Sequence, residues 1–166
     1  MNVSLLRTDR EITEIYKQYV KIIYRIALMM LKNVSEAEDA TQTVFIKLIE
    51  SKKYFESDDH LKAWLIVTTR NICKNVLKGS WHSKRIDYES VTEESYIHDE
   101  SAKELWEKII SLDEKYKLPV YLHYYEGYKT EEIAKMLKIN HATIRTQLRV
   151  AREKLKYLLA DGCEFL

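Results

Sequence analysis

Apolar residues recur every three to four positions along most of this chain, which is the spacing of one buried face on an α-helix. The first such run lies between residues 8 and 33. Thr8 and Glu11 stand at its start with the spacing of a capping box, so we expect a long helix that ends near Asn33. Its predicted buried face consists of Ile12, Ile15, Tyr16, Tyr19, Ile22, Ile23, Ile26 and Met30.

A second helix is predicted to begin at Ser35 and Glu38, which repeat the capping-box spacing. Its inward residues are Ala37, Ala40, Val44 and Leu48. Phe45 lies off the centre of this stripe. Two interpretations stay open: Phe45 reaches a partner protein, or the stripe is wide and Phe45 belongs to the core.

The pattern lapses between residues 51 and 59, which predicts a loop with two adjacent aromatic residues, Tyr54 and Phe55. Aromatic rings beside lysines suit the stacking of unpaired bases, but rings that fold back over the core explain the sequence equally well.

A third helix is predicted from about His60 to Lys78. The residues expected to face inward are Leu61, Trp64, Leu65, Thr68, Ile72 and Val76. Polar and cationic residues lie on its outer faces, namely Lys62, Arg70, Asn71, Lys74 and Lys78. Such a face can follow a nucleic-acid backbone, or it can consist of ordinary solvated lysines.

Residues 130–158 predict two short helices joined by a tight turn, the pattern of a helix-turn-helix. Thr130 is the expected N-cap of the first helix and Asn140 that of the second. An apolar seam is formed by Ile144, Leu148, Ala151, Leu155 and Leu158. The opposite side carries Ala142, Thr143, Arg145, Thr146, Gln147, Arg149 and Arg152, residue types that contact base edges and phosphates in a major groove. The alternative is a solvated cationic helix end.

Between these runs, residues 79–98 show no sustained period and are predicted to link two helical domains. A helix is expected to resume near Asp99, and Ser111 with Glu114 gives a capping box for the next one, which Pro119 should start or kink. We therefore predict an all-α chain with a domain at 1–79, a linker at 80–98 and a second domain at 99–166.

Composition agrees with an all-helical chain, since 166 residues include only one Pro and three Gly. The formal net charge of +1 says nothing about nucleic acid, but the charges are segregated. Residues 60–85 contain no acid, whereas residues 87–107 are dominated by Asp and Glu. Two basic surfaces therefore flank an acidic connector.

The sequence lacks the residue patterns that several kinds of chemical site require. Cys73 and Cys163 are far apart, and the five histidines do not pair at ligand spacing, so we expect neither a disulfide nor a metal site nor any cofactor. No glycine-rich phosphate loop or nucleophile elbow is present, so we expect no enzyme and no small-molecule substrate. The polar N-terminus and the absence of a long apolar run predict a cytoplasmic protein that does not insert into membranes.

Three segments in the same order resemble the bacterial extracytoplasmic-function (ECF) sigma factors: EAEDATQTVFIKLIE at 36–50, LKAWLIVTTRNICKNVLK at 61–78, and LPVYLHYYEGYKTEEIAKMLKINHATIRTQLRVAREKL at 118–155. The resemblance implies a first domain that binds core RNA polymerase and the edge of the melted DNA. It implies a second domain that reads the −35 promoter element, and an anti-sigma factor as a further partner.

The resemblance also implies roles for individual residues. It places contacts to the clamp of the largest polymerase subunit at Glu38, Asp39, Gln42 and Phe45. It places −10 contacts at Tyr54, Phe55, His60, Lys62, Arg70, Asn71 and Lys74, and −35 contacts on the helix that carries Arg145, Thr146 and Arg149. The chain departs from the family at Thr43, where Glu is common, and at Gln147 and Val150, where basic residues are common.

Two rival functions are distinguishable. A helix-turn-helix regulator that works without polymerase would use its first domain to dimerise or to bind a ligand. A helical enzyme that modifies nucleic acids would need a catalytic cluster, and the sequence offers none.

Overall fold

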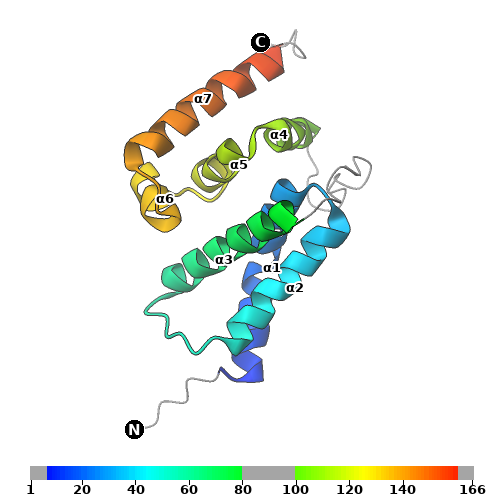
Figure 1. Cartoon of the computed structure of the whole chain (residues 1–166), viewed down its shortest axis with the longest axis vertical. Helices are drawn as coiled ribbons and strands as arrows, with labels where there is room; N and C mark the ends of the chain where they lie inside the picture. Colours follow the sequence, from blue (N-terminus) through cyan, green and yellow to red (C-terminus); the bar gives the residue numbers. More distant parts are fainter. Residues whose placement is uncertain (1–6, 80–99, 161–166) are drawn as a thin grey trace. The chain divides into compact units, whose positions relative to one another are not determined.

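The computed structural model describes residues 7–79 and 100–160, and these residues form helices and short connections without any strand (Figure 1). The predicted all-α class is confirmed. The helices are α1 (Asp9–Leu31), α2 (Val34–Glu50), α3 (Asp58–Gly79), α4 (Glu100–Ser111), α5 (Glu114–Val120), a π-helical turn (Tyr121–Tyr125), α6 (Thr130–Leu137) and α7 (His141–Ala160). They fall into two compact units, α1–α3 and α4–α7. The predicted linker, residues 80–98, and Cys163 lie outside the described residues.

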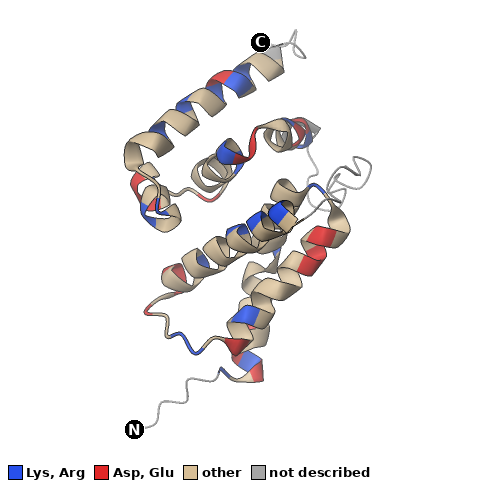
Figure 2. Cartoon of the chain, in the orientation of Figure 1, with Lys and Arg blue, Asp and Glu red and all other residues tan. Residues whose placement is uncertain are grey.

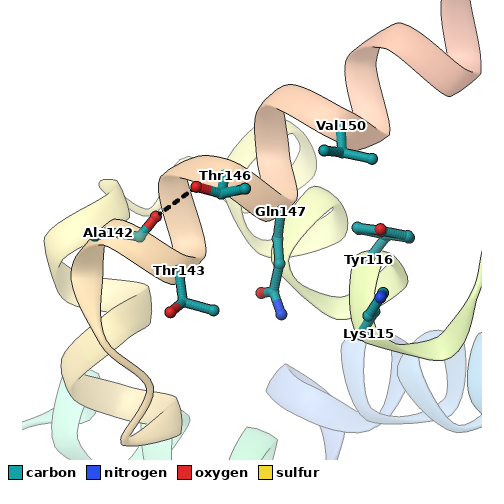
Figure 3. A pocket seen from close by; sticks show the side chains of 7 residues that line it. All are labelled: Lys115, Tyr116, Ala142, Thr143, Thr146, Gln147 and Val150. Atoms are coloured by element: carbon teal, nitrogen blue, oxygen red, sulfur yellow. Dashed lines mark hydrogen bonds between the residues drawn. The ribbon is translucent and has the colours of Figure 1, made fainter.

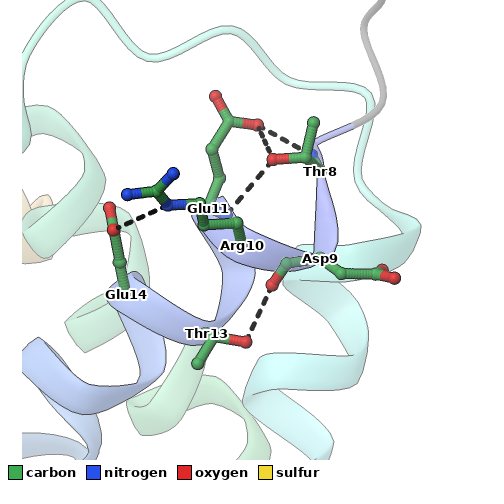
Figure 4. Close-up of polar contacts among 6 residues, drawn as sticks. All are labelled: Thr8, Asp9, Arg10, Glu11, Thr13 and Glu14. Atoms are coloured by element: carbon green, nitrogen blue, oxygen red, sulfur yellow. Dashed lines mark hydrogen bonds and ion pairs between the residues drawn. The ribbon is translucent and has the colours of Figure 1, made fainter.

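The first unit is built around α1, which packs against both α2 and α3. The predicted capping box is confirmed: the Glu11 amide donates to the Thr8 hydroxyl at 3.2 Å, and the Thr8 amide donates to the Glu11 carboxylate at 2.7 Å (Figure 4). These bonds lower the pKa of Glu11, with the backbone bond as the main cause. The helix ends at Leu31, where Lys32 takes the left-handed conformation with φ 54°.

Two details of α2 and α3 differ from the prediction. The N-cap of α2 is Asn33, whose side chain accepts from the Glu36 amide at 2.9 Å, so the proposed Ser35 and Glu38 box is wrong. In α3 the buried seam is turned toward other residues, namely Leu61, Leu65, Ile66, Thr69 and Cys73. The expected inward residues Trp64, Thr68, Ile72 and Val76 are half-buried. The buried Thr69 hydroxyl is satisfied by the Leu65 carbonyl at 2.7 Å, which lets a polar residue lie in the seam.

Phe45 belongs to the core of the first unit. Its side chain is 5% exposed and meets the Tyr16 ring edge-on, with 4.9 Å between centroids. Of the two interpretations that the sequence left open, the wide stripe describes the placement of Phe45. The reason is that α2 is covered by two helices, so its buried arc extends beyond the Ala37, Val44 and Leu48 line.

The second unit is held together by α7, which packs against α4, α5 and α6. Ile144, Leu148, Ala151 and Leu155 are buried as predicted, while Leu158 is half-buried. The predicted box at Ser111 and Glu114 is wrong: Ser111 ends α4, and its hydroxyl donates to the Lys108 carbonyl at 2.6 Å. Pro119 lies inside α5 and so does not start it, and the π-helical turn begins two residues later, at Tyr121.

The helix-turn-helix is present, with α6 and α7 as its two helices. Asn140 caps α7 as predicted, because its side chain accepts from the Ala142 amide at 2.8 Å. Thr130 is not the N-cap of α6. That position is Lys129, and the Thr130 hydroxyl instead lies 2.8 Å from Nε2 of His141, which ties the starts of the two helices together. Gly127 takes φ 74° before α6 and ends the π-helical turn, a conformation that favours glycine.

Replacing Phe45 with Ala should destabilise the first unit by about 3–5 kcal/mol, because it removes a buried ring and leaves a cavity between helices. Urea unfolding followed by circular dichroism measures the change in free energy. Tyr54→Ala is the control, since that ring is 73% exposed and its loss should change the free energy by less than about 0.5 kcal/mol. Equal effects of the two substitutions would contradict the placement of Phe45 in the core.

Candidate nucleic-acid and polymerase interfaces

The outward side of α7 carries the predicted −35 residues. Ala142, Thr143, Arg145, Thr146, Arg149 and Arg152 are exposed, and Gln147 is half-buried. Arg145, Arg149, Arg152 and Lys156 recur at steps of four, three and four residues, so they form one cationic line along the helix, visible as blue bands in Figure 2. Arg149 pairs with Glu153 at 3.1 Å, and both side chains are exposed. Such a surface pair contributes little free energy, so Arg149 can exchange it for a phosphate at small cost.

A second side of α7 faces a hollow of about 450 Å³ (Figure 3). The hollow is lined from the start of α5 by Lys115 and Tyr116, and from α7 by Ala142, Thr143, Thr146, Gln147 and Val150. The Gln147 side chain points into this hollow, and its Oε1 is buried without a hydrogen-bond partner. Gln147 is therefore directed toward α5 more than toward the cationic line.

Sequence reasoning missed the residues of α5 and the preceding turn that approach this helix. Lys154 donates to the Asp113 carboxylate at 3.0 Å, and its ammonium group lies 4.9 Å from the centre of the Tyr116 ring. The hydrogen bond lowers the pKa of Asp113 and raises the pKa of Lys154. Lys115 lies 5.1 Å from the same ring. No local pattern could have shown this, because Asp113 and Lys154 are 41 positions apart.

The two aromatic residues of the loop between α2 and α3 differ in their exposure. Tyr54 is 73% exposed. Phe55 is half-buried and packs edge-on against His60 and Trp64 of α3, with centroids 5.3 and 5.5 Å apart. Phe55 therefore folds back onto α3, as one interpretation of the loop has it, whereas the stacking of a base on the exposed Tyr54 stays a prediction.

The cations of α3 do not all share one face. Arg70, Lys74 and Lys78 recur every four residues and follow one line, with the exposed Asn71 beside it. Lys62 lies about a third of a turn from the centre of this line, on the same side of α3 as the buried seam. His60 is exposed and lies in the first turn of α3. Its amide donates to the hydroxyl of Ser57, the residue directly before the helix, at 3.1 Å.

The outward face of α2 combines acids with exposed apolar residues. Glu38, Asp39 and Gln42 are exposed and share this face with Ile46 and Ile49, which are 51% and 53% exposed. The acids form the red bands near the start of α2 in Figure 2. Sequence reasoning missed both isoleucines, although their positions off the buried stripe are a readable signal. Phe45 is buried behind this face and is not part of its exposed surface.

Comparison with known proteins shows which family each of the two units resembles. The family model for sigma-70 region 2 matches residues 15–83, and that for sigma-70 region 4 matches residues 102–155. The curated ECF RNA polymerase sigma factor SigW of Bacillus subtilis is 27% identical over 91% of this chain and 88% of its own length. SigM of the same species is 27% identical over 91% and 96%. The chain belongs to the ECF sigma factors.

Solved structures show the same fold for this sigma factor. The sigma factor RpoE of Bartonella quintana, solved in complex with the anti-sigma factor NepR, superposes with a TM-score of 0.71 at 20% identity, over 89% of this chain and 96% of that one. CnrH, solved with the cytosolic domain of CnrY, gives a TM-score of 0.68 at 17% identity, over 94% and 92%.

Membership of this family decides between the functions that the sequence left open. The chain is a sigma factor that acts with RNA polymerase, and a helix-turn-helix regulator that works without polymerase is not favoured. Sigma factors are regulatory proteins and not catalysts. Among the described residues, no three His, Cys, Asp or Glu side chains gather to hold a metal ion, and no helix has the length and apolar character of a membrane span.

Proposed function

We propose that this sigma factor binds core RNA polymerase through α2, opens promoter DNA with the loop and cations beside α3, and reads the −35 element with α7. The observation that supports the proposal most directly is the order of the two family regions on two separate units, each with an exposed polar or charged helix face. The proposed limits are 1–79 and 99–166, joined by residues 80–98.

The polymerase surface is proposed to consist of Glu38, Asp39, Gln42, Ile46 and Ile49. Two isoleucines that are half exposed in the free chain gain free energy when a partner covers them, on the order of 1 kcal/mol or more each. The acids at the start of α2 can then select a basic partner helix, as the family resemblance implies for the polymerase clamp. Phe45 supports this surface by fixing α2 and does not contact the partner directly.

The −10 surface is proposed to combine Tyr54 with the cationic line of α3. Separating a base from its stack costs a few kcal/mol, and stacking on an exposed aromatic ring returns roughly 1–3 kcal/mol. Arg70, Lys74 and Asn71 can hold the backbone of the opened strand. Phe55 and His60 are proposed to support the loop. The Phe55 ring packs against the His60 ring, and the His60 amide bonds to Ser57 at the start of α3.

The −35 surface is proposed to be the cationic line of α7 together with Ala142, Thr143 and Thr146. An arginine that pairs with a guanine edge supplies most of the sequence discrimination at its position. Gln147 and Val150 line the hollow and add no charge, so this sigma factor makes fewer phosphate contacts there than relatives with basic residues.

Regulation is proposed to follow the pattern of the two similar structures, both of which are complexes with a second protein, in one case a named anti-sigma factor. An anti-sigma factor that covers the α2 face would block polymerase. The sigma factor itself carries out no covalent chemistry, needs no cofactor and works in the cytoplasm, where polymerase and promoter DNA are found.

Asp39→Arg should abolish binding to core polymerase, and Ile46→Ala should weaken it by about tenfold or more, because the first reverses a charge and the second removes apolar area from the interface centre. Co-purification and surface plasmon resonance with core polymerase measure both effects. Lys17→Ala, an exposed change on α1, is the control and should bind normally. Normal polymerase binding by Asp39→Arg with unchanged helical content would contradict the proposed surface.

Arg145→Ala should relax sequence preference at one base pair of the −35 element and cost about 1–3 kcal/mol on the preferred sequence. Arg152→Ala should instead weaken all sequences evenly and reduce the salt slope by about one counterion. Holoenzyme affinities for a panel of −35 variants at several salt concentrations separate these outcomes. If Arg145→Ala leaves the holoenzyme affinity unchanged for every −35 variant, Arg145 does not contact the −35 element.

A further inference from the structure

One side chain outside every predicted site holds the loop that presents Tyr54. Arg7 precedes α1, and its guanidinium donates to three carbonyls at the end of α2 and in the following loop: Leu48 at 3.4 Å, Ser51 at 3.3 Å and Lys53 at 2.7 Å. Figure 1 shows the start of α1 beside the end of α2. A cation suits this position because the last carbonyls of a helix carry partial negative charge.

The same guanidinium also covers an aromatic ring. Its central carbon lies 4.9 Å from the centre of the Phe55 ring, on a residue that itself packs against His60 and Trp64 of α3. Arg7 therefore joins the end of α2, the loop and, through Phe55, the start of α3. The five donors of a guanidinium are spread over three nitrogens of one planar group, so it can reach separate carbonyls and lie over a ring at once, whereas the three donors of a lysine share a single nitrogen.

The loop on both sides of Tyr54 is thereby fixed. Lys53 is held through its carbonyl by Arg7, and its amide donates to the Ser51 hydroxyl at 3.1 Å. On the other side, the Glu56 amide donates to Nδ1 of His60 at 3.3 Å. Tyr54 projects from between these points with 73% of its surface exposed.

We infer that Arg7 is a positioning residue for promoter opening, which holds the α2–α3 loop in the shape that offers Tyr54 to an unpaired base. This inference rests on the proposed role of Tyr54. A loop that is ordered before DNA arrives loses less conformational entropy on binding. More of the favourable free energy of base stacking therefore remains as net binding free energy. Arg7 itself faces the loop carbonyls and Phe55, and it acts on DNA through Tyr54.

The test uses the full-length chain in holoenzyme with core polymerase, on a promoter fragment that the wild-type holoenzyme selects from a random library. Permanganate reactivity of unpaired thymines gives the rate of strand opening. Arg7→Ala should slow opening by about tenfold while polymerase affinity stays unchanged. Arg10→Ala is the matched control, because this arginine lies three residues later and pairs with Glu14 at 3.5 Å on the surface (Figure 4). It should open the fragment at the wild-type rate.

The double variant decides whether Arg7 acts through Tyr54. If it does, Arg7→Ala combined with Tyr54→Ala opens the fragment no more slowly than Tyr54→Ala alone. Multiplied effects would overturn the inference, since Arg7 would then contribute by another route. A wild-type rate for Arg7→Ala would overturn it as well.

Arg7→Lys covers the case in which Arg7→Ala loses helical content. It keeps the charge but cannot make three carbonyl contacts and cover the ring, so it should fold normally and open the fragment at an intermediate rate. Wild-type opening by Arg7→Lys would contradict the role of the planar group. A wild-type holoenzyme that selects and opens no fragment counts against the proposed function itself, a result separate from any effect of Arg7.

Discussion

Each helix of this chain buries one face in its own unit, and that burial fixes which side chains remain for a partner. The second half of α1 is the strongest case: Ile23, Ile26, Ala27 and Met29 are fully buried between α2 and α3. Because this packing sets the rotation of α2, the face with Asp39 and Ile46 must point outward. In the second unit, the seam of α7 sets the direction of its arginines in the same way.

The sequence predicted the fold class, most helices and the outward face of α7, because these follow from periodicity within one helix. It failed where a residue's environment comes from another helix. The seam of α3 rotated toward Ile66, Thr69 and Cys73, since two neighbours determine which side is covered. Three caps were misplaced at Ser35, Ser111 and Thr130, because several polar residues lie near each helix start and only the backbone path chooses among them.

The candidate surfaces show the same division. The cationic line of α7 was readable, whereas the placement of Phe45 stayed open between core and partner, since its burial depends on Tyr16 of another helix. Ile46 and Ile49 could have been found from their places off the apolar stripe. The contacts of Arg7 with Leu48, Ser51 and Lys53 span more than forty positions, and no local pattern predicts them.

The proposed DNA surfaces are modest, with a handful of cations each, so neither unit alone should bind duplex DNA better than the roughly 10⁻⁴ to 10⁻⁶ M of non-specific binding. Polymerase would hold both at a fixed spacing and raise their effective concentration on the promoter. Nuclease footprinting of the full-length chain with and without core polymerase tests this account most directly. We predict no sequence-specific protection by the free protein at micromolar concentration, and protection of two elements with strand opening at the downstream one when polymerase is added. A tight palindromic footprint from the protein alone would contradict the account.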